Sequence, residues 1–445
     1  MLADLDFARQ QIERIRSAEL IATRGRLTRV MPTFVEADGP HAPVGTVCQI
    51  DCQGRSPIDA EIVSVDERRV VLMPYDSIHG LMVGDSVQAL QRSARVSVGA
   101  GFLGRVVNAV GAPLDGGAPI MAEADRPLHG HPISPLAREG ACSPLETGVR
   151  VIDALLTIGR GQRMGIFAGS GVGKTTLLNC MTHNVTADIR VVCLVGERGR
   201  EAEEFWNHVL TEEQRASSIL VVSTSNEPAI VRARAVHYAQ ALAEHFRDQG
   251  AHVLFVLDSM TRLAMALREI GLAVGEPPTV RAYTPSVFAV MPQVIERFGA
   301  LRGAGAITAL VSVLTESDDA DDPLAETLKA LLDGHIVLSR ELAEQGQLPA
   351  VDVQRSVSRY FRTVADIDAQ ALAGEAVGQL AAYASSRSLV ESGMYKPGMN
   401  ARLDRALACR EGLLTLLRQP TGEHVPRARA LTALAEVLST SGKHG

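Results

Sequence analysis

The chain has 445 residues, of which 46% are hydrophobic and 4% aromatic, and its formal net charge at pH 7 is −7. This length is enough for two or three domains with a buried core, and the acidic balance argues against general affinity for nucleic acid, which normally depends on a basic surface. No apolar run approaches the roughly 20 residues that a membrane-spanning helix needs.

The N-terminal residues and the cysteines indicate a cytoplasmic protein. Asp4, Arg9 and Glu13 stand where a signal peptide would require an apolar core, so we do not expect export. No two cysteines form a C-x-x-C pair, and a zinc site would need further ligands nearby. We therefore interpret the cysteines as buried, reduced thiols; they are Cys48, Cys52, Cys142, Cys180, Cys193 and Cys409.

Residues 1–23 precede the first predicted domain, and Leu5, Ile12 and Ile15 recur there among charged and amide side chains. The spacing predicts a short amphipathic helix over residues 3–17. This segment could dock on a partner or a membrane surface, or it could pack on its own domain. The sequence does not distinguish these roles.

Residues 24–95 form a β-rich region with turns marked by glycine and proline. The runs are Thr28–Val35, Gly45–Asp51, Ala60–Val65, Val70–Met73 and Asp85–Leu90. They predict a small β-barrel domain. Small barrels often bind oligonucleotides by stacking bases on aromatic side chains, but Phe34 and Tyr75 are the only aromatic residues here. We therefore favour a role in packing or in forming an oligomeric ring.

Residues 96–370 begin with a stretch rich in glycine and proline and then alternate between buried-type strands and helical segments. That alternation predicts an α/β domain built on a parallel sheet. We expect its strands at Met164–Phe167, Val191–Val195, Ile219–Ser223, Val253–Leu257, Ala306–Leu314 and His335–Ser339. Residues 371–445 lose the strands, and their Ala- and Leu-rich pattern predicts a helical domain with helices over 371–390, 400–418 and 426–440.

Residues 168–176 read Ala-Gly-Ser-Gly-Val-Gly-Lys-Thr-Thr and directly follow an expected strand. The glycines let backbone N–H groups converge on the oxygens of a triphosphate, and the helix that begins at Lys174 adds the positive end of its dipole. Lys174 can reach the β- and γ-phosphates, and Thr175 can offer a hydroxyl to Mg²⁺. The predicted nucleotide-binding residues are Gly169, Ser170, Gly171, Val172, Gly173, Lys174, Thr175 and Thr176.

Acidic residues follow two of the other expected strands. Asp258 stands directly after an apolar strand, where P-loop proteins usually hold Mg²⁺ through water. Hydrolysis needs a group that polarises the attacking water, and Glu197 is our candidate for that general base. Arg198 would steady the same phosphate, and Glu201 could hold a water of the metal. Acids at this place could also simply favour a helix N-terminus.

Several longer strings occur in a fixed order along the chain. They are Ala168–Thr175, Gly196–Glu201, Asp258–Arg262, Gly275–Pro278, Tyr283–Phe288, Leu332–Arg340, Pro349–Asp352 and Ser356–Arg359. Together they closely resemble the ATPases of type III protein export, which are relatives of the catalytic β subunit of rotary ATP synthases. The resemblance covers about residues 25–420 and implies a RecA-like P-loop core between the barrel and the helical domain.

The resemblance also implies roles for single residues in an ATP- and Mg²⁺-dependent reaction. Lys174 and Thr175 match the family's phosphate and Mg²⁺ ligands, Glu197 the catalytic base and Asp258 the second metal residue.

Three arginines complete the implied site. Arg198 and Arg262 would flank the γ-phosphate. Arg359 matches the arginine that a neighbouring subunit supplies in a homohexamer, and such an arginine finger is worth roughly 10³–10⁵ in rate.

Leu348 departs from the family pattern, because relatives often place there an aromatic residue that stacks on adenine. Selectivity for the base is therefore expected to be loose.

The partners implied by the resemblance are other copies of the chain, a stator-type regulator at the N-terminus, a central stalk protein, secretion chaperones and export substrates. The resemblance also implies peripheral contact with the inner-membrane export apparatus, and it implies no binding of nucleic acid.

Within the family, the stretch Glu391–Asn400 looks more like the branch of virulence injectisomes than the flagellar branch.

Two other classes of function remain as alternatives. A non-catalytic ring subunit would keep the phosphate loop and lose the catalytic base. The presence of Glu197 argues against that class of protein. A hexameric RNA translocase would share the ring and the loop, but the aromatic-poor barrel and the net charge of −7 argue against it.

Overall fold

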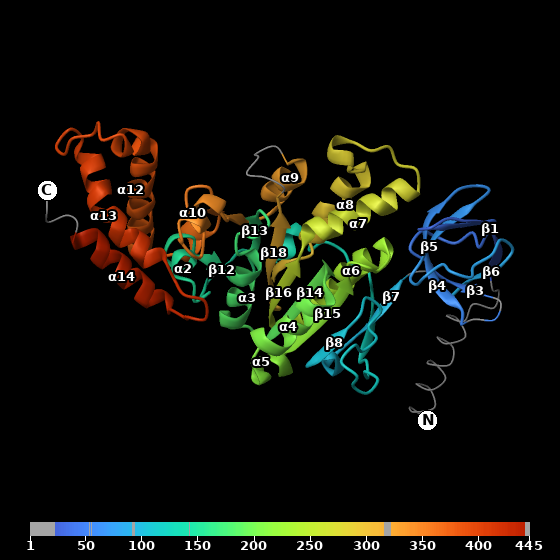
Figure 1. Ribbon diagram of the computed structural model, residues 1–445. Helices are drawn as coiled ribbons and strands as arrows, with labels where there is room; N and C mark the ends of the chain where they lie inside the picture. The colour runs from blue at the N-terminus through green and yellow to red at the C-terminus, as the bar shows by residue number, and fades with distance from the viewer. Residues whose placement is uncertain are drawn as a thin grey trace, which may run out of the picture. The chain divides into compact units, whose positions relative to one another are not determined.

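The structure is a computed structural model that describes residues 23–440 except 53, 55, 91–93, 142 and 316–321. The helix expected over residues 3–17, and Cys142, lie outside the described residues. The chain divides into two compact units (Figure 1). One contains the barrel up to Ala94 together with Leu272–Glu276, and the other contains the remaining described residues. No helix in the described residues has both the length and the apolar character needed to cross a bilayer.

The first unit is a closed barrel of six strands in the order β1-β2-β5-β4-β3-β6. The strands are β1 (Arg24–Val30), β2 (Val35–Ala37), β3 (Val47–Asp51), β4 (Ile58–Val65), β5 (Val70–Pro74) and β6 (Ser86–Ala89). Closure leaves no unpaired edge. The expected single run Thr28–Val35 is wrong, because β1 ends at Val30 and β2 starts at Val35. Pro32 stands between them and cannot donate to a ladder.

The second unit is built on a mainly parallel sheet with the strand order β20-β19-β13-β18-β16-β14-β15-β8, and β17 and β10 extend it beside β18. All neighbours from β19 to β8 run parallel, so their carboxyl ends share one edge. The strands are β8 (Arg105–Val107), β10 (Arg138–Glu139), β13 (Arg163–Ala168), β14 (Ile189–Glu197), β15 (Ser218–Thr224), β16 (His252–Asp258), β17 (Gly299–Leu301), β18 (Ala306–Leu314), β19 (Gly334–Val337) and β20 (Val357–Ser358).

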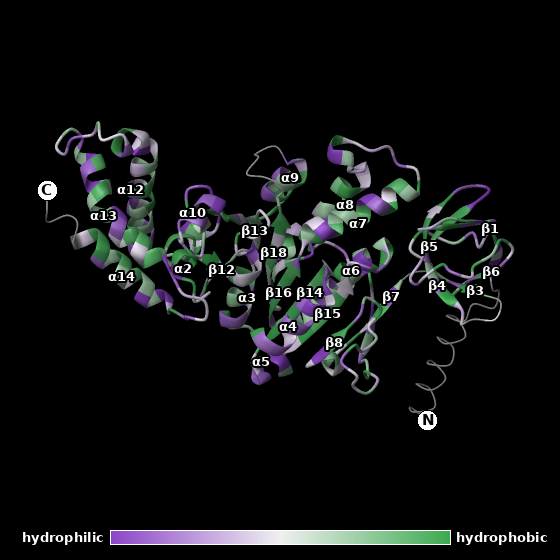
Figure 2. Cartoon of the chain, in the orientation of Figure 1, coloured by the Kyte–Doolittle hydropathy of each residue, from purple (hydrophilic) through white to green (hydrophobic). Residues whose placement is uncertain are grey.

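The six strands expected from apolar runs are all present in this sheet. Figure 2 shows that the central strands β14 and β16 are almost uniformly hydrophobic, as strands covered on both faces must be, whereas α4 and α5 are hydrophilic. One limit differs, since the strand expected to reach Ser339 ends at Val337. Ser339 instead caps α10, where its hydroxyl accepts from Leu342 N at 3.4 Å.

Helices flank the sheet and form the C-terminal part of the unit. They are α2 (Arg150–Leu155), α3 (Lys174–Asn184), α4 (Gly199–Glu204), α5 (Glu212–Ala216), α6 (Ala229–Asp248), α7 (Met260–Ala273), α8 (Pro285–Ile295), α9 (Pro323–Leu331), α10 (Arg340–Glu344), α11 (Phe361–Val364), α12 (Ile367–Glu391), α13 (Ala401–Leu417) and α14 (Arg427–Thr440). A π-helical turn (Phe205–Val209) follows α4, and short 3₁₀ turns lie at Ala100–Phe102, Pro135–Ala137 and Val280–Ala282. Two small ladders pair β7 (Arg95–Val98) with β9 (Ala124–Pro127), and β11 (Pro144–Leu145) with β12 (Ile158–Gly159).

The three C-terminal helices match the expected ones within a few residues. α12 begins earlier than predicted, at Ile367, because the Asp366 side chain caps it by accepting from Ala369 N at 2.8 Å. Leu413 and Leu434 belong to the same apolar core as the sheet residue Ile166. The predicted fold class, an α/β P-loop core with an N-terminal β-barrel and a C-terminal helical region, is confirmed.

Candidate active site

The phosphate loop lies between β13 and α3, and α3 begins at Lys174 as predicted. Gly171 and Gly173 have φ of +80° and +96°, in the left-handed region that glycine favours. No heavy atom lies within 4 Å of an ideal Cβ at either residue, so the space beside the loop is open. The first turn of α3 contains no acidic residue, and its unpaired backbone N–H groups are suited to a phosphate.

The other loop residues support this picture. Ser170, Thr175 and Thr176 are exposed, so the two threonine hydroxyls are accessible at the start of α3. The carbonyl of Ser170 accepts from Arg340 Nη2 at 3.3 Å. Val172, in contrast, is buried and packs into the core, which anchors the loop.

Lys174 is buried at the carboxyl edge of the sheet and has two polar partners. Its Nζ donates to Asp258 Oδ1, with which it forms an ion pair, and to Ser312 Oγ at 3.2 Å. Ser312 Oγ in turn donates to Asp258 Oδ1 at 2.6 Å. The three side chains come from α3, β16 and β18, so the parallel sheet brings the loop lysine to the acid predicted to serve the metal.

Glu197 ends β14, beside the end of β16 that carries Asp258. Burial and then the nearby charge of Asp258 raise the Glu197 pKa to about 7, while the positive charge of Lys174 acts in the opposite direction. A hydrogen bond with Glu201 raises it as well. Glu197 therefore titrates close to neutral pH, which suits a group that takes a proton from water.

Arg262, on α7, approaches Glu197 from the neighbouring element. Its Nε lies 3.8 Å from Glu197 Oε1, and this buried nitrogen has no hydrogen-bond partner among the described residues. Gly196 makes the approach possible, because a Cβ there would stand 3.1 Å from Arg262 Cδ. Arg198 is exposed at the N-terminus of α4, next to Glu197 in the chain.

The carboxylates of Glu197 and Asp258 repel each other, and a divalent cation would stabilise them together. Glu197 and Asp258 lie close enough for their charges to interact, and Lys174 is the nearby cation. The described residues contain no group of three or more metal-ligating side chains. That is consistent with Mg²⁺, which is usually held by one or two protein groups together with phosphate oxygens and waters.

The structure does not bring Arg359 to this site. Arg359 follows β20, which pairs antiparallel with β19 so that Ser358 stands opposite Gly334. Gly334 in turn lies beside Met164, near the start of β13, whereas the phosphate loop follows the end of that strand. Four residues of β13 lie between Met164 and the end of the strand at Ala168, which corresponds to a distance of roughly 13 Å. Arg359 is exposed, and its Nη2 donates to the Lys329 carbonyl at 3.2 Å.

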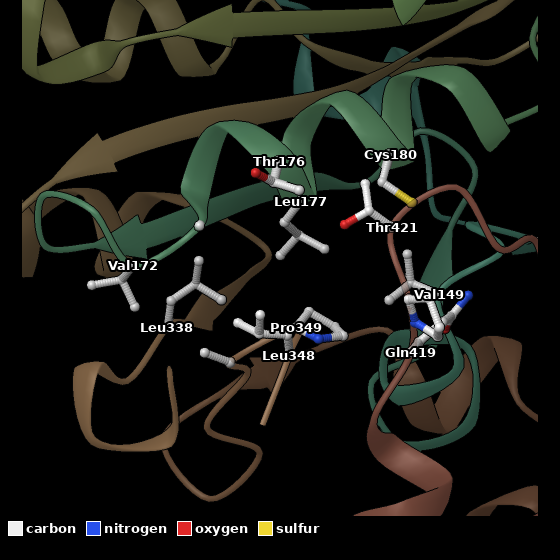
Figure 3. A pocket seen from close by; sticks show the side chains of 13 residues that line it. Val149, Val172, Thr176, Leu177, Cys180, Leu338, Leu348, Pro349, Gln419 and Thr421 are labelled. Atoms are coloured by element: carbon white, nitrogen blue, oxygen red, sulfur yellow. The ribbon is translucent and has the colours of Figure 1, made fainter. Parts of the chain in front are cut away.

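A pocket of about 190 Å³ adjoins the phosphate loop on the side of α3. Figure 3 shows Thr176, Leu177 and Cys180 of α3 along one side, Leu338, Leu348 and Pro349 across from them, and Thr421 at one end. Its lining is mostly apolar. The polar Gln419 also contributes, but its amide is already bonded to the carbonyls of Gly148 and Glu423, at 2.8 and 2.7 Å, and to Arg150 N at 2.8 Å.

Two features of the site were not predicted from the sequence. Ser312 was read only as part of an apolar strand, and a lone serine in such a run is a weak signal. Ser223, at the end of β15, is buried, and its hydroxyl donates to Glu227 at 2.5 Å, which adds a further carboxylate at the same edge of the sheet.

Of the five described cysteines none is in a disulfide, but Cys180 is only half-buried, which corrects the expectation that all are buried.

This fold and this site define a nucleotide-binding protein of the P-loop class, with a parallel sheet and a distinct β-barrel. Comparison with known families gives three consecutive matches. The ATP synthase alpha/beta family matches with its beta-barrel domain at residues 27–91 and with its nucleotide-binding domain at residues 148–358. The T3SS EscN ATPase C-terminal domain matches residues 365–436.

Curated relatives extend along nearly the whole chain. The flagellum-specific ATP synthase of Bacillus subtilis is 42% identical over 421 residues, which cover 93% of this chain and 94% of that protein. The type 3 secretion system ATPase of Sinorhizobium fredii is 42% identical over 401 residues, covering 90% and 89%. The chain belongs to the ATP synthase alpha/beta family, and within it to the flagellar and type III secretion ATPases.

Solved structures agree with this assignment. The assembled ATPase EscN of the enteropathogenic E. coli type III secretion system superimposes with a TM-score of 0.89 at 37% identity, covering 93% of this chain and all of that one. The same ATPase in complex with its central stalk EscO gives a TM-score of 0.85 at 36% identity. The chain is thus an ATPase of the group that contains the flagellar and type III secretion ATPases.

Proposed function

We propose that this chain hydrolyses ATP at the edge of its parallel sheet to energise type III protein export. The observation that carries the proposal is the contact between Lys174, at the phosphate loop, and Asp258. Glu197 lies beside them, and the pKa of Glu197 is raised to about 7. A subunit that only binds nucleotide has no need of a carboxyl group tuned to accept a proton. The relative from Sinorhizobium fredii is a type 3 secretion system ATPase, which supports the role in export.

Each residue has a defined task in the proposed reaction. The N–H groups of Gly169–Lys174 hold the phosphates, and Lys174 neutralises charge on the β- and γ-phosphates. Glu197, in its ionised form, orients the attacking water and takes up its proton. Arg262 lies beside that base and stabilises charge on the γ-phosphate.

Thr175 and Asp258 would hold Mg²⁺, with Glu201 on one of its waters. The cation, when bound, would neutralise charge on the phosphate oxygens.

The apolar pocket beside α3 is the proposed site for the base of the nucleotide. It adjoins the loop at Val172 and Gly173, has a volume of about 190 Å³, and is also lined by Leu348 and Thr421. Stacking and apolar contact would hold the base there, since the Gln419 amide already bonds to the backbone.

The oligomer proposed for this chain is a homohexamer in which Arg359 acts on the nucleotide of the next subunit. The support is that Arg359 lies at the opposite end of the strands from its own phosphate loop. The solved relative EscN is described as assembled, and one structure contains its central stalk. We extend the proposal to a central stalk, a stator-type regulator at the N-terminus, secretion chaperones with their substrates, and peripheral contact with the inner-membrane export apparatus.

The direct test is phosphate release by wild-type protein and by Glu197→Gln. We expect wild-type hydrolysis to rise steeply with protein concentration, because the site is completed on assembly. Glu197→Gln should bind ATP and turn it over at less than about 1% of the wild-type rate, since general-base catalysis is worth roughly 10²–10⁴. Glu204→Gln, an exposed acid at the end of helix α4, which follows β14, is the matched control and should remain active. Turnover by Glu197→Gln at the wild-type rate would overturn the proposed mechanism.

The system served is proposed to be an injectisome, on the basis of the stretch Glu391–Asn400. Relatives of both flagellar and secretion type share 42% identity with the chain, so the comparisons favour neither. Deletion of the gene followed by assays of effector secretion and of swimming motility separates the two. Loss of secretion with normal swimming supports the injectisome, and loss of swimming alone assigns the chain to the flagellum.

A further inference from the structure

Ser312 is a buried hydroxyl in the middle of an apolar strand. It lies in β18, between β13 and β16, and is 0% exposed. Its neighbours Val311 and Val313 are also fully buried apolar residues. A buried hydroxyl is unfavourable unless it is hydrogen-bonded, so its partners show what keeps it there.

Both partners of Ser312 belong to the candidate site. Its hydroxyl donates to Asp258 Oδ1 at 2.6 Å and accepts from Lys174 Nζ at 3.2 Å. A serine hydroxyl has one proton to donate and two lone pairs, so it can make both bonds at once. Ser312 thus connects the lysine of the phosphate loop to the acid at the end of β16.

The ion pair between Lys174 and Asp258 has to loosen when nucleotide binds. Under the proposed function, on which this inference rests, Lys174 donates to phosphate oxygens, and its contact with Asp258 weakens. Asp258 is only 4% exposed, and a buried carboxylate that loses its partner is strongly disfavoured. The Ser312 hydroxyl remains bonded to the same carboxylate oxygen throughout.

We propose that Ser312 is a positioning residue that holds the Asp258 carboxylate in place while Lys174 exchanges that carboxylate for phosphate. The hydroxyl fixes Oδ1, and the other carboxylate oxygen, Oδ2, would be available to the cation and its waters. Without the hydroxyl, the carboxylate rotates more freely and binds the cation less well. The effect should therefore appear in the contribution of Mg²⁺ to nucleotide affinity, and much less in affinity for the nucleotide alone.

The test measures binding of a fluorescently labelled ADP to the full chain, once with Mg²⁺ and once with EDTA. The ratio of the two affinities is the readout. Ser312→Ala should lower this ratio about tenfold, as expected for the loss of a hydrogen bond to a charged group. Affinity in EDTA should stay within about twofold of wild type. Ser312→Thr, which keeps the hydroxyl, should restore the ratio.

Thr308→Val provides the matched control. Thr308 is a fully buried hydroxyl on the same strand, bonded to Gly161 N and His252 Nε2, each at 2.8 Å, and it lies four residues from Ser312. Its loss should leave the ratio unchanged. An unchanged ratio in Ser312→Ala, or an equal fall in Thr308→Val, overturns the inference.

Folding is checked by thermal unfolding of each variant. If Ser312→Ala unfolds at the assay temperature, Ser312→Cys takes its place, because a thiol keeps a similar shape with a weaker donor. The same loss of the Mg²⁺ contribution is expected, and its absence overturns the inference. Failure of the proposed function looks different, since wild-type protein would then neither bind the labelled ADP nor hydrolyse ATP.

Discussion

Arg262 Nε lies 3.8 Å from Glu197 Oε1, and that buried nitrogen has no hydrogen-bond partner in the described part of the chain. The distance is too long for a hydrogen bond, and an unpaired buried N–H is unfavourable. A small closure of α7 toward β14 would satisfy the group, and a phosphate oxygen between the two side chains would also do so. The arginine is therefore positioned for a ligand rather than for the resting structure.

Replacement of Arg262 by alanine should lower kcat about 10- to 100-fold, the loss expected for one charged hydrogen bond in the transition state. ATP affinity should change much less, because we assign the contact of Arg262 with phosphate mainly to the transition state. Arg268→Ala, on the same helix, is the control, since Arg268 lies over the Tyr283 ring at 5.8 Å. Steady-state kinetics of both variants measure the difference. Equal kcat in Arg262→Ala and wild type would exclude this role.

The pKa of Glu197 predicts the pH dependence of hydrolysis. Because burial and the charge of Asp258 raise this pKa to about 7, most of the carboxyl is protonated at pH 6 and most is ionised at pH 8. A general base works only when ionised, so kcat/KM should rise through an apparent pKa near 7 and then level off. A profile with no inflection between pH 6 and 8 would show that another group limits the reaction.

The same shift predicts how Glu197 affects stability. A carboxyl whose pKa is higher in the folded chain than its ordinary value of 4.5 opposes folding at pH values above the folded pKa of about 7, and this penalty vanishes below the ordinary value. The full shift corresponds to roughly 3 kcal/mol, but solvent reaches this group, so we expect about 1 kcal/mol. Glu197→Gln should raise the free energy of unfolding at pH 8 and leave it nearly unchanged at pH 4.5.

Urea unfolding of nucleotide-free protein at both pH values measures this effect. Glu204→Gln is again the control, because Glu204 is exposed and its removal should change little at either pH. A stabilisation of equal size at pH 4.5 and pH 8 would show that it does not come from the ionisation of Glu197.

Much of the fold could be predicted because burial leaves a clear pattern in the sequence. Strands covered on both faces read as continuous apolar runs, and Ala306–Leu314 was predicted with its observed limits. The phosphate loop was predicted because glycines and one lysine at fixed spacing meet a backbone requirement that few other sequences meet. Short edge strands such as β8 and β20, of three and two residues, leave no such pattern.

The contacts between distant residues could not be predicted in the same way. Ser312 reaches Asp258 only because β18 and β16 pair in one register, which no local pattern encodes. The position of Arg359 likewise depends on β20 running antiparallel to β19. The predicted roles of Glu197, Asp258 and Arg359 therefore came from chemistry and resemblance, and they stay predictions until the variants are measured.

Mixing two inactive variants tests whether Arg359 acts across a subunit interface. Lys174→Ala removes the loop lysine and Arg359→Ala removes the finger, and each alone should lose roughly 10³-fold or more in rate. In an equal mixture, about one quarter of the interfaces pair an intact loop with an intact finger, and up to that share of wild-type activity should return. Phosphate release after co-assembly measures it. No recovery in rings shown to contain both variants would contradict a shared site.

Selectivity for the base follows from the pocket beside α3. The Gln419 amide is bonded to backbone, and Leu348, 49% exposed, offers an apolar surface without an aromatic ring. Apolar pockets discriminate weakly between ligands of similar shape, so kcat/KM for the purine nucleotides ATP, GTP and ITP should agree within about tenfold. Leu348→Tyr should lower KM for all three nucleotides several-fold and leave kcat unchanged, since stacking on a base is worth about 1–3 kcal/mol and tolerates any base. A wild-type preference for ATP of a hundredfold or more would mean that polar groups outside this pocket read the base.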